Sequence, residues 1–409
     1  MKILIFTHIF PFPLDEGGKT AQFNFIERAA LEHEIILVPL TSGVDTSTES
    51  AFLKTLPAVR IERVYFKDLT PNHTFFQKVA RKLIWWLRKL LPKVEQKIIN
   101  NQYFLNPVPV RNEDIVLQIN QLIAAKNPDI IQVDFIDNAD LGCIIPKNYH
   151  SCLILHDLRS ESVKQYCKQF DIAPGYQEYL AKNVSYKELP YMQEFDSVIT
   201  FNEYESDLVR KWNPNVIVNS FAVSNNYLTV ELNNQKLKNI VFLGSDTHFP
   251  NADGLHWFAK EVGSRLFERF GLHTKVIGHW NDKREEFRIY PFITFLGFKE
   301  DLKQEMRNSI LVVPIRIGSG VRTKILEAFA MGVPVISSAK GMDGINAVSG
   351  IHYLKADSLE EYEIAVSKLL NDQAFVQKMR EAARIFVREN FSQERATKDR
   401  IEFYRTIAG

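Results

Sequence analysis

Short apolar runs recur along the chain, and longer amphipathic stretches separate them. The runs are continuous rather than alternating, which is typical of strands buried on both faces of a parallel sheet. The first set of expected strands is Lys2–Phe6, Glu34–Leu40, Arg60–Phe66, Asp129–Val133, Cys152–Leu155, Asp196–Phe201 and Asn215–Val218. The second set is Asn239–Leu243, His273–Ile277, Phe292–Leu296, Ile310–Val313, Pro334–Ser337 and Ile351–Leu354. Helical spacing fills the gaps, and one predicted helix face consists of Leu255, Phe258, Val262 and Leu266.

The two sets of strands indicate two domains. A polar, asparagine-rich stretch lies between them at Asn219–Lys238. The pattern predicts an α/β protein with two doubly wound, Rossmann-like domains. We expect the domains at residues 1–220 and 239–389, a linker at 221–238, and a charged amphipathic helix at 390–409 that ends the chain. Ligands of open α/β sheets bind beyond the carboxyl ends of the strands, so two facing domains would hold the ligand in a central cleft.

Composition excludes several classes of protein. A net charge of +1 gives no global reason to expect nucleic-acid binding. The three cysteines, Cys143, Cys152 and Cys167, lack metal-ligand spacing, and their odd number argues against a disulfide framework. The apolar runs are all shorter than the ~18–20 residues that span a bilayer, and the first run is too short for a signal peptide. We therefore expect a protein of the reducing cytoplasm.

The segment from Pro314 to Ser337 carries the clearest chemistry. It is expected to form a strand, a glycine-rich turn, a helix, a turn and a strand. Arg322 and Lys324 fall where this helix begins, although the helix dipole already places positive charge there. Cations at a helix N-terminus are favourable if an anion binds, because free N–H groups point at the same charge. Glu327 follows one turn later and would accept hydrogen bonds from hydroxyl groups, so the segment predicts a phosphate site.

Other loops after predicted strands carry further candidates. Gly17 and Gly18 allow backbone to approach a ligand, although an ordinary strand–helix loop would look the same. His156 follows a strand and would face the cleft; the alternative is a local hydrogen bond to Asp157 or to backbone. Gly244 and Ser245 form a second loop between strand and helix. We expect Asn251 or Asp253 to cap the helix after that loop.

Two charged clusters allow more than one interpretation. The aspartates of residues 134–140 have the spacing of an ordinary loop and helix cap, so we assign no metal. Lys78–Lys97 is a basic amphipathic segment with two tryptophans, which suits either an anionic membrane surface or a core-packed helix with a solvated face. Binding to nucleic acid has no support elsewhere in the chain.

Residues 311–344 resemble the donor-binding region of the family 4 retaining glycosyltransferases with the GT-B fold. The similarity is strongest with a bacterial subgroup of polysaccharide and lipopolysaccharide enzymes. The matching residues are Pro314, Gly318, Gly320, Arg322, Lys324, Leu326, Glu327, Ala328, Ala330, Gly332, Pro334 and Val335. Weaker agreement comes from the Gly17-Gly18 loop, from His156-Asp157, and from Gly244 with Pro250-Asn251.

The resemblance implies roles for individual residues. Glu327 would bind the donor ribose, and Arg322 and Lys324 would neutralise the donor diphosphate together with N–H groups near Gly320. Gly17 and Gly18 would let the first domain approach the phosphate and the acceptor, and His156 would contact the transferred sugar or a phosphate. The final helix would cross back to the first domain.

The chain departs from the family in two places. Many members carry a sugar-binding glutamate where this chain has Ser319. Many also carry an Arg and a Lys in the loop that here begins at Gly244, and Arg322 and Lys324 would supply that charge instead.

The implied activity is retaining hexosyl transfer from a nucleoside diphosphate sugar to a glycan or lipid-linked hydroxyl acceptor, with neither metal nor cofactor. The protein would work in the cytoplasm or on the inner face of the cytoplasmic membrane. Two alternatives stay open. One is a sugar-nucleotide epimerase or hydrolase, and the other is a non-catalytic protein that binds nucleotide sugars.

Overall fold

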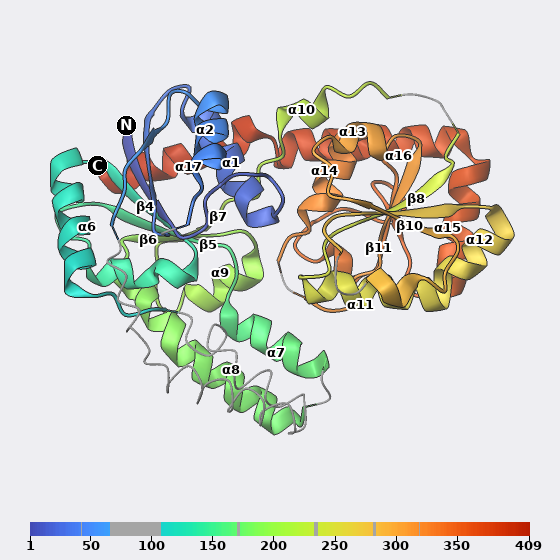
Figure 1. The fold of residues 1–409 in the computed structure, drawn as a ribbon, viewed down its shortest axis with the longest axis horizontal. Coiled ribbons are helices and arrows are strands. Elements are labelled where there is room, and N and C mark those ends of the chain that lie inside the picture. Colours follow the sequence, from blue (N-terminus) through green and yellow to red (C-terminus); the bar gives the residue numbers. More distant parts are fainter. Residues whose placement is uncertain (42, 66–107, 170–171, 233–235, 281–283, 319) are drawn as a thin grey trace, which may run out of the picture.

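The structure is a computed structural model, and it describes residues 1–41, 43–65, 108–169, 172–232, 236–280, 284–318 and 320–409. Two separate parallel sheets dominate it, each covered by helices (Figure 1). The expected basic segment Lys78–Lys97 and the position of Ser319 lie outside the described residues.

The first sheet has seven strands in the order β3-β2-β1-β4-β5-β6-β7. The strands are β1 Lys2–Thr7, β2 Glu34–Pro39, β3 Arg60–Ile61, β4 Ile130–Asp134, β5 Ser151–Leu155, β6 Ser197–Thr200 and β7 Val216–Val218. Along β1, Ile3 and Ile5 join one hydrophobic cluster while Leu4 and Phe6 join another. Both faces of the sheet are therefore buried, which explains why its strands are continuous apolar runs.

Helices cover both faces of this sheet. They are α1 Gly17–Ala29, α2 Thr46–Thr55, α6 Glu113–Lys126, η1 Ile136–Cys143, α7 Arg159–Gln169, α8 Pro174–Glu188, η2 Leu189–Glu194 and α9 Glu203–Val209. Side-chain caps mark several starts: Asn112 accepts a hydrogen bond from the Ile115 amide, and Asn202 accepts one from the Glu205 amide. In Figure 1, α7 and α8 extend away from the sheet as a pair.

The second sheet has six parallel strands in the order β10-β9-β8-β11-β12-β13. They are β8 Asn239–Leu243, β9 His273–Ile277, β10 Ile293–Gly297, β11 Ser309–Val313, β12 Val335–Ser337 and β13 Leu354–Lys355. The last strand begins later than the expected Ile351–Leu354, because Gly350 with φ +83° and the amide of Ile351 form a turn first. β3 is shorter than expected, at the edge of its sheet.

The helices of the second domain are α11 Phe249–Trp257, η3 Phe258–Gly263, α12 Ser264–Phe270, η4 Arg284–Phe287, α13 Leu302–Glu305, α14 Thr323–Met331, η5 Lys340–Met342, α15 Leu359–Asn371 and α16 Gln373–Asn390. The predicted apolar face of Leu255, Phe258, Val262 and Leu266 is fully buried along α11, η3 and α12. That prediction is confirmed.

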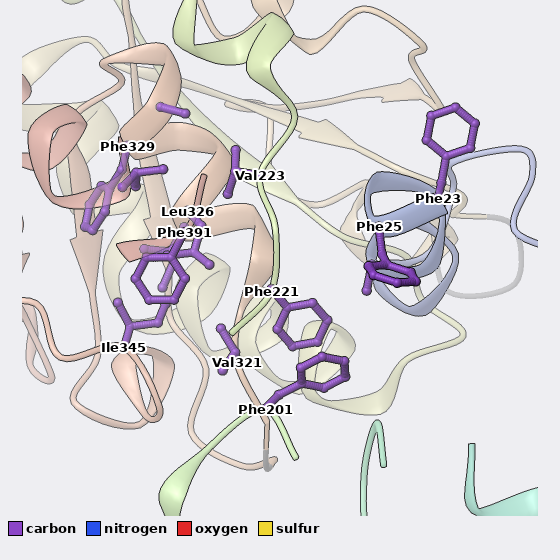
Figure 2. Close-up of a cluster of buried hydrophobic side chains, with 14 of the residues drawn as sticks. Phe23, Phe25, Phe201, Phe221, Val223, Val321, Leu326, Phe329, Ile345 and Phe391 are labelled. Carbon is purple, nitrogen blue, oxygen red and sulfur yellow. The ribbon is translucent and has the colours of Figure 1, made fainter. Parts of the chain in front are cut away.

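Two stretches of chain join the domains. The first contains α10 Asn225–Leu228, and the second leads from α16 into α17 Gln393–Ala408, which packs on α1 of the first domain (Figure 1). The two stretches bind each other, since the Val223 amide donates to the Phe391 carbonyl at 2.8 Å. Phe201, Phe221 and Val321 belong to one hydrophobic cluster that spans both domains (Figure 2).

Candidate functional site

The carboxyl ends of the two sheets face each other, and contacts between the loops show it. A Cβ atom at Gly17, in the loop after β1, would lie 3.5 Å from Thr323 Oγ1 at the start of α14. A Cβ atom at Gly344, after β12, would lie 3.7 Å from the Cβ of Asn202, after β6. Helices α1 and α14 therefore begin opposite each other, and their free N–H groups lie in the same region between the domains.

The segment that the sequence singled out forms β11, a turn, α14 and β12, as expected. Arg322 is the N-cap residue of α14, and its Nη1 donates to the Gly320 carbonyl at 2.5 Å. Gly318 and Gly320 have positive φ angles, and a Cβ at Gly318 would lie 2.8 Å from Arg322 Nη2. Glycine at 318 therefore provides the space in which this buried guanidinium lies.

Lys324 reaches across to the loop after β8. Its ammonium donates to the Leu243 carbonyl and, at 2.8 Å, to Asn251 Oδ1. A Cβ at Gly244 would lie 2.5 Å from the Asn251 side chain, so glycine is required there. Lys324 thus places an ammonium group at the loop after β8.

The expected capping role of Asn251 or Asp253 is wrong. His248 is the N-cap residue of α11, and its side chain makes no capping hydrogen bond. Asn251 is occupied by Lys324 and by the Ser245 carbonyl, to which its amide donates at 3.2 Å. Asp253 pairs with Arg316 at 2.6 Å. Both side chains therefore bind residues that are distant in the sequence instead of capping the helix.

Burial brings the pKa values of two charged residues of α14 close to neutral pH. It lowers the pKa of Lys324 to about 7, with a further contribution from Arg322. It also raises the pKa of Glu327 to about 7, and the nearby Lys324 opposes that shift. Within the described part of the chain, the Glu327 carboxylate accepts no hydrogen bond. An anion beside Lys324 and hydroxyl donors beside Glu327 would each stabilise the charged form.

On the first domain, Gly18 and His156 lie together, as the cleft hypothesis requires. A Cβ at Gly18 would lie 3.2 Å from the Phe135 ring and 3.9 Å from His156 Nδ1. The His156 ring stacks on Phe135 at 3.8 Å between centroids. Phe135 has φ +70°, a strained conformation for an aromatic residue, and such strain concentrates at functional sites.

The hydrogen-bond partner of His156 is not Asp157. His156 Nε2 lies 3.3 Å from Asp134 Oδ1, whereas Asp157 pairs with Arg159 at 3.1 Å. The alternative of a local hydrogen bond to Asp157 is therefore wrong. The Nδ1 atom of His156 is buried and has no hydrogen-bond partner among the residues that the structure describes. It lies beside Gly18, where a substrate group would approach.

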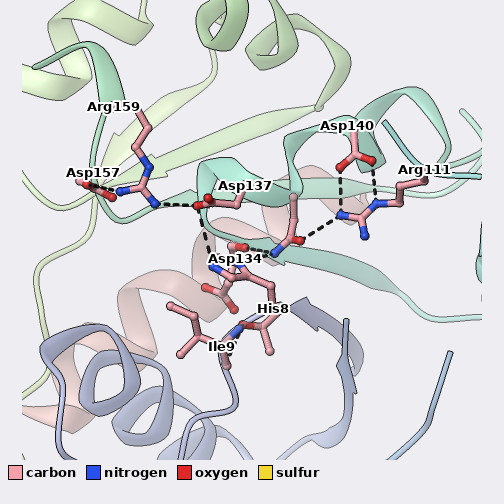
Figure 3. Close-up of polar contacts among 10 residues, drawn as sticks. His8, Ile9, Arg111, Asp134, Asp137, Asp140, Asp157 and Arg159 are labelled. Carbon is pink, nitrogen blue, oxygen red and sulfur yellow. Dashed lines mark hydrogen bonds and ion pairs between the residues drawn. The ribbon is translucent and has the colours of Figure 1, made fainter. Parts of the chain in front are cut away.

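A network of charged and polar side chains continues from this point, and sequence reasoning missed most of it (Figure 3). Arg159 Nη2 donates to Asp137 at 2.9 Å, and Arg111 forms a two-pronged pair with Asp140. Asn138 lies 3.1 Å from the Nδ1 of His8. Burial lowers the pKa of His8, and Asp137 opposes that shift. The aspartate cluster was visible in the sequence, but nothing there marked Arg111 or Arg159 as its partners.

No group of three or more metal-binding side chains occurs within residues that the structure describes, and the aspartates of η1 pair with arginines instead. A helix long and apolar enough to cross a bilayer is absent from the same ranges.

Comparisons with known proteins agree with this architecture. Residues 237–372 match the family described as glycosyl transferases group 1, while no curated protein matches the chain. HepE from Anabaena, solved with UDP, is 11% identical with a TM-score of 0.63, over 99% of this chain and 100% of that one. Sucrose-phosphate synthase from Thermosynechococcus elongatus is 16% identical with a TM-score of 0.68, over 99% and 98%. WaaG, a glycosyltransferase involved in lipopolysaccharide biosynthesis, is 13% identical with a TM-score of 0.60, over 97% and 99%. The expected GT-B fold is confirmed.

Proposed function

We propose that the chain transfers a hexose from a nucleoside diphosphate sugar to a hydroxyl acceptor, because residues 237–372 match the glycosyl transferases group 1 family and the chain has the GT-B fold. The observation that carries this proposal is the pair of facing helix starts. The N-terminus of α14, with Arg322 and Lys324, lies opposite Gly17 at the N-terminus of α1. Two sets of free N–H groups and two cations suit one diphosphate.

Electrostatic stabilisation of the leaving group is the main catalytic contribution in this proposal. As the bond between sugar and diphosphate breaks, negative charge grows on the phosphate oxygens, and Arg322, Lys324 and the helix N–H groups stabilise it without reorganising. Glu327 accepts hydrogen bonds from the ribose hydroxyls. His156 contacts the transferred sugar from the first domain.

The proposed stereochemical course is retention. A phosphate oxygen of the leaving group takes the acceptor proton on the same face of the sugar, so the reaction needs neither a protein general base nor a metal. The resemblance of residues 311–344 to retaining enzymes supports this course. The role of Ser319 in holding the sugar, and membrane contact through residues 78–97, stay predictions.

The proposed acceptor is a glycan or a lipid-linked saccharide. WaaG is described as acting in lipopolysaccharide biosynthesis, and a structure of TarM contains UDP with a glycerol-linked GlcNAc, which supports glycan-type acceptors on this fold. The nucleotide of the donor is best sought first among uridine diphosphate sugars, since HepE binds UDP-glucose.

A two-stage experiment tests the proposal. Nucleoside diphosphate sugars are first screened for an increase in melting temperature, and the stabilising donor is then assayed for consumption with and without membrane lipid extract. Arg322→Ala should lower turnover and Glu327→Ala should weaken nucleotide binding, both with the fold retained. Donor consumption at the same rate with and without the extract would favour an epimerase or hydrolase. Donor binding without consumption would favour a non-catalytic protein.

A further inference from the structure

A chain of hydrogen bonds runs from the last helix to the histidine of the site. Tyr404 of α17 donates from its hydroxyl to Gln132 Oε1 at 2.7 Å. Gln132 Nε2 then donates to Asp134 Oδ2 at 2.9 Å, and Asp134 Oδ1 lies 3.3 Å from His156 Nε2. Residues far apart in the sequence are thus joined beneath the first-domain site.

The chain is buried along its length. Tyr404 is 0% exposed, and Gln132 and Asp134 are each 1% exposed. The His156 side chain is 7% exposed. Water therefore offers little competition for these hydrogen bonds, and each group depends on its protein partner.

The direction of the hydrogen bonds follows from the Asp134 carboxylate, which only accepts. Gln132 therefore turns its amide nitrogen to Asp134 and its oxygen to Tyr404, whose hydroxyl donates to that oxygen. That carboxylate in turn accepts from His156, so the neutral imidazole carries its proton on Nε2.

The opposite ring nitrogen is then an acceptor. His156 Nδ1 is buried, lies near Gly18 and has no hydrogen-bond partner within the described part of the chain. Stacking on Phe135, whose backbone has a positive φ, holds the ring in this orientation. A hydrogen-bond acceptor at this place suits a substrate hydroxyl, since a carbonyl or phosphate oxygen would repel it.

We infer that Tyr404, Gln132 and Asp134 are positioning residues that hold His156 in the Nε2–H tautomer, so that Nδ1 accepts a hydrogen bond from a hydroxyl of a bound saccharide. The inference rests on the proposed function only for the identity of the ligand. In this inference, helix α17, which follows the second domain in the sequence, helps to shape the site of the first domain.

The tautomer can be measured without any substrate. The full chain is labelled with ¹⁵N-histidine, and the His156 signals are identified among the 10 histidines by their loss in His156→Gln. The wild type should show a protonated Nε2 and an unprotonated Nδ1. In Asp134→Asn, Gln132 donates to the new amide oxygen, and the amide nitrogen faces His156, so the proton should move to Nδ1.

A milder pair of variants covers the case in which Asp134→Asn does not fold. Tyr404→Phe removes the start of the chain and should produce a mixture of the two tautomers. Tyr362→Phe is the matched control, because Tyr362 is equally buried but its hydroxyl has no hydrogen-bond partner in the described ranges. A tautomer that is unchanged in Tyr404→Phe, or a wild type protonated at Nδ1, would overturn the inference.

Kinetics adds a second readout. Asp134→Asn should lower kcat by about 10²-fold, the upper end of the range for loss of a group that orients a histidine directly. Tyr404→Phe should lower kcat by about tenfold, similar to the loss of a partner behind a metal-binding histidine. The affinity for UDP, measured by calorimetry, should stay unchanged in both. Correct tautomers without any sugar transfer in the wild type would instead refute the proposed function and leave the positioning role intact.

Discussion

The two facing edges of the molecule use charged side chains in opposite ways. On the first domain, Arg111 and Arg159 are paired with Asp140 and Asp137, so their charge is compensated within the protein. On the second domain, Lys324 donates to two neutral oxygens, those of Leu243 and Asn251. The first edge presents a closed polar network, whereas the hydrogen-bond partners of Lys324 on the second edge are neutral oxygens.

This difference shows why residue type alone does not identify a ligand site. An arginine between aspartates stabilises a loop, and removing one partner leaves a buried charge. A lysine whose pKa burial has lowered to about 7 is costly to keep charged unless a ligand shares its surroundings. The proposed diphosphate would therefore stabilise the charged form of Lys324.

The largest expected effect is at Lys324. Replacing Lys324 with methionine should lower kcat/KM for the donor by about 10²–10³-fold, because a preorganised cation at the leaving group is lost. Lys303→Met is the matched control, since Lys303 also donates to an asparagine oxygen of the chain, Asn226, at 2.9 Å. Equal kinetic constants for the two variants would show that Lys324 contributes no more to the reaction than Lys303 does, and the contrast between the two edges would have no functional meaning.

The second prediction concerns Arg111. The side chains of Arg111 and Asp140 are 8% and 10% exposed, so Arg111→Ala should lower the free energy of unfolding by about 3 kcal/mol in urea titration. The exposed pair of Arg60 and Glu34 is the control, and Arg60→Ala should cost less than about 1 kcal/mol.

At acidic pH, Arg111→Ala should lower the free energy of unfolding by a smaller amount. Burial already raises the pKa of Asp140, so without Arg111 this carboxyl protonates more readily and the buried charge disappears. UDP affinity should not change in this variant. Weakened UDP binding with an unchanged free energy of unfolding would contradict the structural role.

The smallest effect is a proton exchange on binding. Diphosphate beside Lys324 should raise a pKa that is about 7 in the free protein, so UDP binding near pH 8 should take up protons. Ribose hydroxyls that donate to Glu327 should lower its pKa of about 7, so net uptake should be smaller near pH 6. Calorimetry in buffers of different ionisation enthalpy measures the number of protons taken up on binding. If the uptake persists in Lys324→Met, the proton binds a group other than Lys324.

Much of the architecture was predictable from the sequence because its signals are local. Buried parallel strands require continuous apolar runs, and all thirteen strands of the described chain coincide with, or overlap, the thirteen expected segments. The region around Arg322, Lys324 and Glu327 could also be predicted from the sequence, since a turn, a helix start and the charges on it lie within a few consecutive residues. Their roles in binding stay predictions until ligands are tested.

The partners of these groups were decided only by tertiary structure. Asn251 seemed suited to a helix cap, yet packing of α14 brought Lys324 to it. Tyr404 and Gln132 are 272 positions apart and have no common motif, and Arg111 meets Asp140 only because α6 and η1 lie on the same sheet. The sequence by itself determined strands, helices and the place of one charged helix start, because these depend on neighbouring residues. Which buried groups compensate one another depends on distances that exist only after the sheets have formed and the last helix has docked on the first domain.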